Sequence, residues 1–106
     1  VSGNTTRMVE IARTEKDPDL RLRAVRNLGV MGGKAAADTL LEIYANEKDP
    51  AIRRTVINSL FTSDNATALV ALARKEQDMA MKTEIVRRLS NMDNKEAQAY
   101  MLELLK

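Results

Sequence analysis

Four acidic residues recur at related places along the chain and form the first candidate site. Three glutamates occupy one column of an internal repeat, and an aspartate lies one helical turn before the second of them. These residues are Glu10, Asp38, Glu42 and Glu103. Paired carboxylates can catalyse hydrolysis when a pocket holds them about 5–10 Å apart with shifted pKa values. Because an exposed helix face implies no such pocket, we expect a non-catalytic chain.

The same acidic column has two other interpretations. It is either a stripe that receives a basic segment of a protein partner or simply a solvent-facing polar surface. We take the stripe as the candidate partner-binding site, because stacked-repeat proteins bind their partners mainly through extended concave surfaces.

A basic residue also stands at a fixed place in each repeat, as Arg21, Arg53 and Lys82. One interpretation is a ladder of cations along a phosphate backbone or an acidic partner. The other is a stacking role, in which each cation pairs with an acid of a neighbouring repeat while its stem covers the core. We favour stacking, because one basic residue per repeat is the pattern that stacking would produce. The ladder interpretation gives the alternative function, in which the basic face formed by the first helix of each two-helix repeat binds nucleic acid weakly.

Composition argues against a dedicated nucleic-acid binder. Tyr44, Phe61 and Tyr100 are the only aromatic residues on which bases could stack, and the net charge is only +2. The chain has neither cysteine nor histidine, and therefore lacks thiolate chemistry and the commonest general base and metal ligand. We expect no cofactor and no metal.

Targeting signals are also missing from the sequence. No apolar run approaches the roughly 20 residues of a membrane-spanning helix, so no membrane partner is expected. No signal peptide is recognisable, and the cytoplasm is only the default expectation for the compartment.

An internal repeat positions the candidate residues. Glu-Lys-Asp-Pro opens the first copy at residues 15–18 and the second at 47–50, and Glu-Gln-Asp-Met opens the third at 76–79. Each opening is followed by apolar residues at i, i+4, i+5 and i+8, which is the spacing of one helical stripe. The three copies are Leu20, Ala24, Val25 and Leu28; Ile52, Val56, Ile57 and Leu60; and Met81, Ile85, Val86 and Leu89.

A second apolar stripe follows in each repeat and also precedes the first opening. Its columns are Met8, Leu40, Leu69 and Met101; Val9, Leu41, Val70 and Leu102; and Ile11, Ile43, Leu72 and Leu104. Each repeat is therefore expected to be a pair of helices whose apolar faces are buried when neighbouring pairs stack. Asp17, Asp49 and Asp78 are expected to cap the first helices, and Gly32-Gly33 to end one of them.

The pattern predicts an all-α fold, a right-handed α–α superhelix of about three and a half two-helix repeats. The half repeat covers residues 4–14 and the full repeats cover 15–46, 47–75 and 76–106, within one domain over 1–106. The half repeat lacks its first helix, and the last helix is apolar with no capping repeat. We therefore expect a section of a larger protein, or open ends that associate with another copy.

These repeats resemble the HEAT-like repeat named after the phycobilisome lyases. The resemblance is carried by Asp17-Pro18-Asp19-Leu20-Arg21 with Ala24 and Leu28-Gly29, and by Asp49-Pro50-Ala51-Ile52-Arg53 with Val56 and Leu60. The third copy departs from it, since Met79 and Lys82 replace the proline and the arginine, and Phe61 and Ser90 stand where the first copy has Gly29. The resemblance implies a curved rod whose second helices line the concave face. The function expected with it is a protein–protein interaction scaffold or adaptor, and nothing in the residues suggests a tetrapyrrole pocket.

Overall fold

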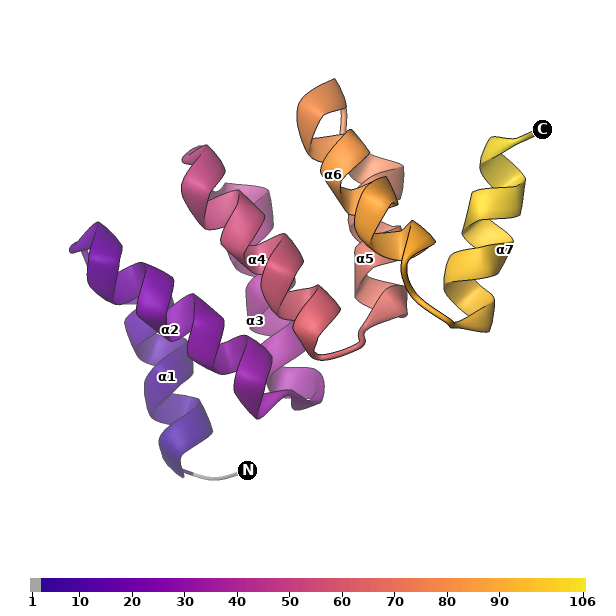
Figure 1. The fold of residues 1–106 in the computed structure, drawn as a ribbon. Coiled ribbons are helices and arrows are strands. Elements are labelled where there is room, and N and C mark those ends of the chain that lie inside the picture. The colour runs from indigo at the N-terminus through magenta and orange to yellow at the C-terminus, as the bar shows by residue number, and fades with distance from the viewer. Residues whose placement is uncertain (1–2) are drawn as a thin grey trace.

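The computed structural model describes residues 3–106, which form seven α-helices and no strand (Figure 1). The helices are α1 (Gly3–Thr14), α2 (Pro18–Met31), α3 (Gly33–Asn46), α4 (Pro50–Thr62), α5 (Ala66–Lys75), α6 (Met79–Ser90) and α7 (Lys95–Leu104). The prediction of an all-α, right-handed superhelix of about three and a half helix pairs is confirmed.

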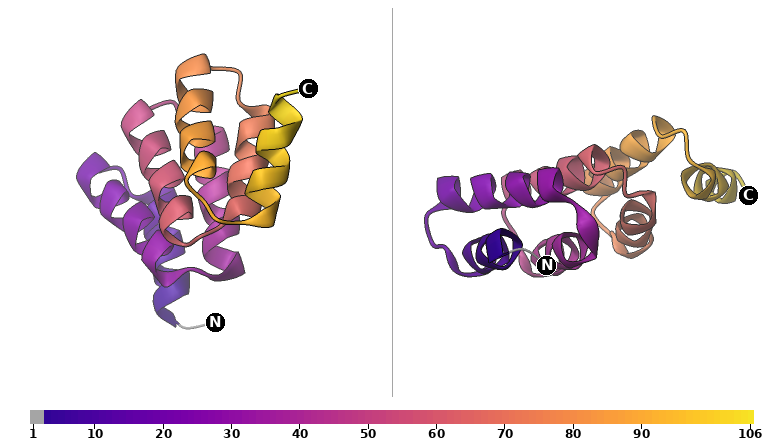
Figure 2. Two further views of the ribbon diagram at one scale, coloured as in Figure 1. Left: turned by 45° about the vertical axis from the view of Figure 1, so that its right-hand side comes forward. Right: turned by 90° about the horizontal axis from the view of Figure 1, so that it is seen from below.

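The helices stack in two layers (Figure 2). The first-helix layer consists of α2, α4 and α6, and the second-helix layer consists of α1, α3, α5 and α7. Each helix packs only against its neighbours in its own layer and in the facing layer, so the molecule is elongated, with extents of 43 × 27 × 17 Å. Each layer therefore presents one continuous face to solvent.

Short polar signals fix where the first helices begin. Asp17 and Asp49 each accept a hydrogen bond from the backbone amide two residues later, and Asp78 accepts one from the amide of Met81. These bonds satisfy amides that have no partner within a helix. Prolines at the first helical position of α2 and α4 lose nothing by lacking an amide hydrogen. The predicted caps are confirmed.

The predicted end of α2 is also confirmed. Gly32 and Gly33 have φ values of +68° and +87°, in the left-handed region that glycine adopts without a steric penalty. The Gly32 amide donates to the Leu28 carbonyl and closes α2, and α3 begins at the next residue.

The core lies between the two layers. Its largest fully buried side chains come from the predicted apolar columns of both helix types; these are Val25, Leu28, Leu40, Val56, Ile57, Leu60, Leu69, Ile85 and Leu89. Burial is lost at the two ends of the stack. Leu20 is 44% exposed and Leu102 is 64% exposed, because no other helix among residues 3–106 covers α2 on one side or α7 on the other.

Candidate functional site

A glutamate at the opening of each later repeat joins that repeat to the one before it. Arg21 Nη1 lies 2.8 Å from Glu47 Oε1, and Arg53 Nη2 lies 2.8 Å from Glu76 Oε1. The second oxygen of each glutamate accepts a hydrogen bond from the backbone amide two residues further on, at 3.1 Å for Glu47 and 2.9 Å for Glu76. One carboxylate therefore fixes the turn of its own repeat and holds the arginine of the preceding repeat.

Glu76 is the more buried of the two, with a side chain only 5% exposed. The Tyr44 hydroxyl donates to the same oxygen that meets Arg53, and the Arg53 guanidinium lies 4.1 Å from the centre of the Tyr44 ring. The Arg53 Nε atom is buried and has no hydrogen-bond partner among the described residues. Tyr44, Arg53 and Glu76 thus form one polar cluster between the second and third repeats.

The charges of this cluster are set by their neighbours. Burial by itself raises the pKa of Glu76, but hydrogen bonds from Tyr44 and the turn amides, together with the Arg53 charge, outweigh it and hold that pKa below its ordinary value. Burial, and then the bond to Glu76, raises the pKa of the Tyr44 hydroxyl. The pKa of Glu47 is lowered in the same way, since its turn bonds and Arg21 outweigh its burial.

The predicted basic ladder therefore divides into two parts. Arg21 and Arg53 are both engaged in ion pairs between repeats, which is the arrangement expected for the stacking role. Lys82, the third member, is partly exposed and makes no ion pair within residues 3–106. Sequence reasoning missed the acidic partners Glu47 and Glu76, although the recurrence of glutamate at every repeat opening was the signal that could have found them.

Ion pairs also cross the second-helix layer and involve two residues of the predicted acidic stripe. Arg13 of α1 donates to both carboxylate oxygens of Glu42 in α3, at 2.7 and 3.2 Å. Arg74 of α5 donates to both oxygens of Glu103 in α7, at 2.5 and 3.1 Å, and lowers the pKa of that carboxyl. Both pairs are about half exposed. They bridge neighbouring second helices at equivalent places.

The other two stripe residues lie on the same layer. Asp38 of α3 pairs with Lys34, one turn earlier, at 2.9 Å. Glu10 of α1 is exposed and makes no ion pair with any described residue. The structure thus brings Asp38 and Glu42 together on α3 and leaves Glu10 and Glu103 near opposite ends of the layer.

The Arg–Glu bridge is missing at one junction, between α3 and α5. Ala45 occupies the place of Arg13 and Arg74, and Ala71 occupies the place of Glu42 and Glu103. Both alanines line a hollow of about 260 Å³ between the two helices. The hollow is bordered by the Tyr44–Arg53–Glu76 cluster and by Lys75.

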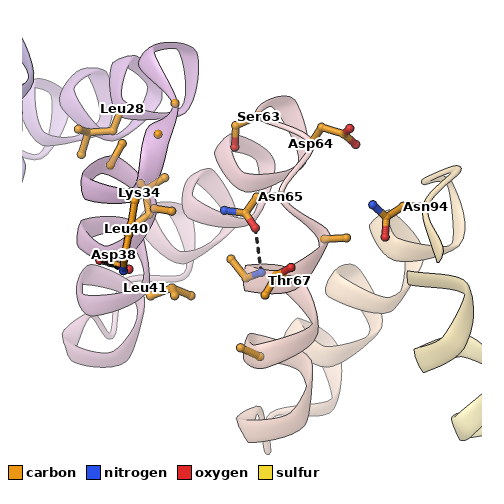
Figure 3. Close-up of a pocket in the computed structure, with 17 residues that line it drawn as sticks. Leu28, Lys34, Asp38, Leu40, Leu41, Ser63, Asp64, Asn65, Thr67 and Asn94 are labelled. Carbon is orange, nitrogen blue, oxygen red and sulfur yellow. Dashed lines mark hydrogen bonds and ion pairs between the residues drawn. The ribbon is translucent and has the colours of Figure 1, made fainter. Parts of the chain in front are cut away.

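A second hollow of about 460 Å³ lies between the beginnings of the same two helices (Figure 3). Lys34 and Asp38 of α3 face Asn65 and Thr67 across it. The side chains of Leu41 and Ala71 border both hollows, so together they form one groove. We call it the α3–α5 groove; its walls are Ala37, Leu41 and Ala45 of α3 and Thr67, Ala71 and Lys75 of α5.

Comparison with known proteins identifies the family of these repeats. Residues 5–74, well over half of the chain, match the family model described as HEAT repeats. The match runs from α1 to the last but one residue of α5, so it covers every wall residue of the α3–α5 groove except Lys75. No curated protein and no solved structure matches the chain. Within the described residues, no helix is both long enough and apolar enough to span a bilayer.

Proposed function

Because the chain belongs to the HEAT-repeat family, we propose that it is a non-catalytic interaction scaffold whose second-helix layer binds a protein partner. The α3–α5 groove is the observation that carries this proposal. It hollows the face of the second-helix layer, where Ala45 and Ala71 leave the junction unbridged. On the first-helix layer, by contrast, Arg21 and Arg53 are already engaged in stacking.

The acidic stripe belongs to the same proposed binding face. Glu42 and Glu103 are neutralised by arginines of neighbouring helices, and Asp38 by Lys34. Glu10 is the stripe residue that offers an unpaired carboxylate to a basic partner. We therefore propose that the stripe flanks the contact surface and contributes to its charge.

We also propose that the repeats are of the phycobilisome-lyase type. The Asp-Pro openings at residues 17 and 49, each with an arginine three residues after the proline, support this subtype. Gly29 supports it as well, because α2 and α4 approach each other closely at that residue.

The proposed organisation is a single domain with a half repeat at 4–14 and full repeats at 15–46, 47–75 and 76–106. The described helix pairs fall within these ranges, whereas residues 1 and 2 lie outside the described part. Exposed leucines on and just after α7 support the further proposal that this end meets another repeat or another copy; they are Leu102, Leu104 and Leu105.

Site-specific photo-cross-linking tests which layer binds. A photoreactive residue at Glu10 or Ala99 samples the second-helix layer outside the groove, and one at Arg23 or Thr83 samples the first-helix layer. In extracts of the cells that naturally make the protein, we expect adducts with a protein from the first pair of positions only. Adducts confined to Arg23 and Thr83 would contradict the proposal.

The nucleic-acid alternative has its own test. DNA or RNA binding at low salt that is strongly salt-dependent, and that is lost when Arg21, Arg53 and Arg87 are changed together to glutamate, would replace the scaffold proposal. We expect no binding above that of the triple variant, because two of these three cations are already paired.

A further inference from the structure

One bridge of a repeating series is absent at the α3–α5 groove. At the α1–α3 and α5–α7 junctions, a long arginine and a glutamate span the gap between second helices. At α3–α5, the two equivalent side chains end at Cβ, and a hollow remains between the helices. A hollow of about 300 Å³ also lies between α1 and α3, but there Arg13 borders the hollow and pairs with Glu42. The α3–α5 groove is thus distinguished by the missing bridge.

The lining of the groove limits what can occupy it. Leu41, Ala71 and Ala37 are partly exposed apolar side chains along its length. The walls are helices, whose backbone groups are largely bonded within each helix, so they offer no strand edge to pair with. An occupant must therefore satisfy its own backbone, as a helix does, and small alanine side chains let such a helix approach closely.

The unpaired charges of the groove have opposite signs at its two ends. Asp64, at the turn before α5, borders the hollow at the beginnings of the helices, and Lys75 borders the hollow at their ends. Neither residue makes an ion pair with any described residue, whereas Lys34, Asp38, Arg53 and Glu76 are all paired. A complementary occupant therefore carries a cation near Asp64 and an anion near Lys75.

The helix dipole then sets the direction of the occupant. A helix is stabilised by acids in its first turn and by bases in its last turn. An occupant with its anion at Lys75 and its cation at Asp64 places its N-terminus at Lys75 and runs antiparallel to α3 and α5. The ten residues of α5 span about 15 Å, which corresponds to roughly three helical turns of the occupant.

We propose that the α3–α5 groove binds a short amphipathic helix of a partner protein. This helix has an acidic first turn, a basic last turn and an apolar stripe at i, i+4 and i+7, and it lies antiparallel to α3 and α5. The inference rests on the proposed scaffold function and specifies the chemistry of the segment that the second-helix layer recognises.

Two designed peptides test this chemistry directly. Both are stapled helices of about 14 residues with the same leucine and alanine stripe. One has glutamates in the first turn and arginines in the last, and the other has these charges exchanged. In fluorescence anisotropy at low salt, we expect the first peptide to bind at least roughly tenfold more tightly than the second.

Protein variants test the location. Ala45→Arg with Ala71→Glu restores the missing bridge, and we expect it to weaken binding of the first peptide by at least roughly tenfold. Ala51→Arg with Ala99→Glu makes the same chemical change at exposed positions outside the groove and should leave binding unchanged. Circular dichroism and urea unfolding show that each variant is folded. Lys75→Glu should remove or reverse the preference between the peptides.

Three results would overturn the inference: equal binding of the two peptides, no binding of either, or wild-type affinity after the bridge is restored. The photo-cross-linking experiment tests the proposed scaffold function separately from the peptide experiment. If the peptides fail while adducts still form at Glu10 and Ala99, a partner binds the second-helix layer outside the groove. If adducts form only on the first-helix layer, the scaffold proposal itself is wrong.

Discussion

Gly29 of α2 and Ser59 of α4 are in direct contact, and a Cβ placed on residue 29 would lie only 2.6 Å from the Ser59 Cβ and 2.8 Å from its Cα. Ser59 is buried, and its hydroxyl donates to the Val25 carbonyl of α2 at 3.2 Å. The backbone of α2 at Gly29 therefore packs directly against the side chain of Ser59 in α4. Gly29 is therefore a close-packing residue between α2 and α4.

Gly29→Ala should destabilise the protein, although alanine is the better helix former at most positions. The added methyl group must displace the α4 backbone, and overpacking of this kind costs about 1–3 kcal/mol. Urea unfolding measures the change. Ser59→Gly in the same chain removes the opposing Cβ, so the double variant should lose less stability than the two single changes added together. A stabilised Gly29→Ala variant would show that the helices can separate freely here.

Leu60→Ala should cost about 2–5 kcal/mol, because Leu60 is fully buried between the layers and its truncation leaves a cavity. Leu102→Ala is the matched control, since Leu102 occupies a predicted apolar column but is exposed on α7. We expect that control to change the free energy of unfolding by less than about 0.5 kcal/mol. Similar effects at the two positions would contradict the described stacking order.

The inter-repeat arginines should contribute more to stability than the arginines of the second-helix layer. Arg53→Met leaves the nearly buried Glu76 carboxylate without its cation, and we expect a loss of about 2 kcal/mol. Arg13→Met removes a half-exposed pair and should cost less than about 1 kcal/mol. Urea unfolding at one salt concentration compares the two. A larger loss for Arg13→Met would mean that the exposed bridges hold the stack together.

Acid should weaken the fold through Glu76. The pKa of this group is lower in the folded protein than in the unfolded chain, so the unfolded chain takes up the proton first as pH falls. The resulting stabilisation is fully present above the ordinary glutamate pKa and is lost as pH falls through the lowered value. Glu76→Gln should therefore lose less stability than the wild type between pH 7 and pH 3. Parallel pH profiles of the two proteins would contradict this assignment.

Much of the fold could be predicted from the sequence because its signals are local. Aspartate caps, prolines at the first helical position and apolar residues at helical spacing lie within a few residues of one another, and each recurs. The exposed ends could not be predicted from a column alone. Leu102 occupies the same repeat column as the buried Val70, but no helix in the described part of the chain covers it.

The candidate site was harder to predict for a geometric reason. Aligning repeats shows which residues are equivalent, but it does not show which residues face each other across a junction. Glu42 and Glu103 therefore looked like a free acidic stripe, and only the structure places Arg13 and Arg74 opposite them. The missing bridge at the α3–α5 groove involves two repeat positions, because both Ala45 on α3 and Ala71 on α5 replace the long side chains found at the other junctions.

The two-sided bonding of Glu47 and Glu76 has a consequence for cooperativity. A turn that forms without the preceding arginine leaves one carboxylate oxygen without its cation, so closing the turn and docking the helix favour each other. The smallest unit that opens as a whole therefore crosses the repeat boundary instead of ending at it. In hydrogen exchange, the turn amides of residues 49 and 78 should report the opening of the helix pair before them as much as of their own.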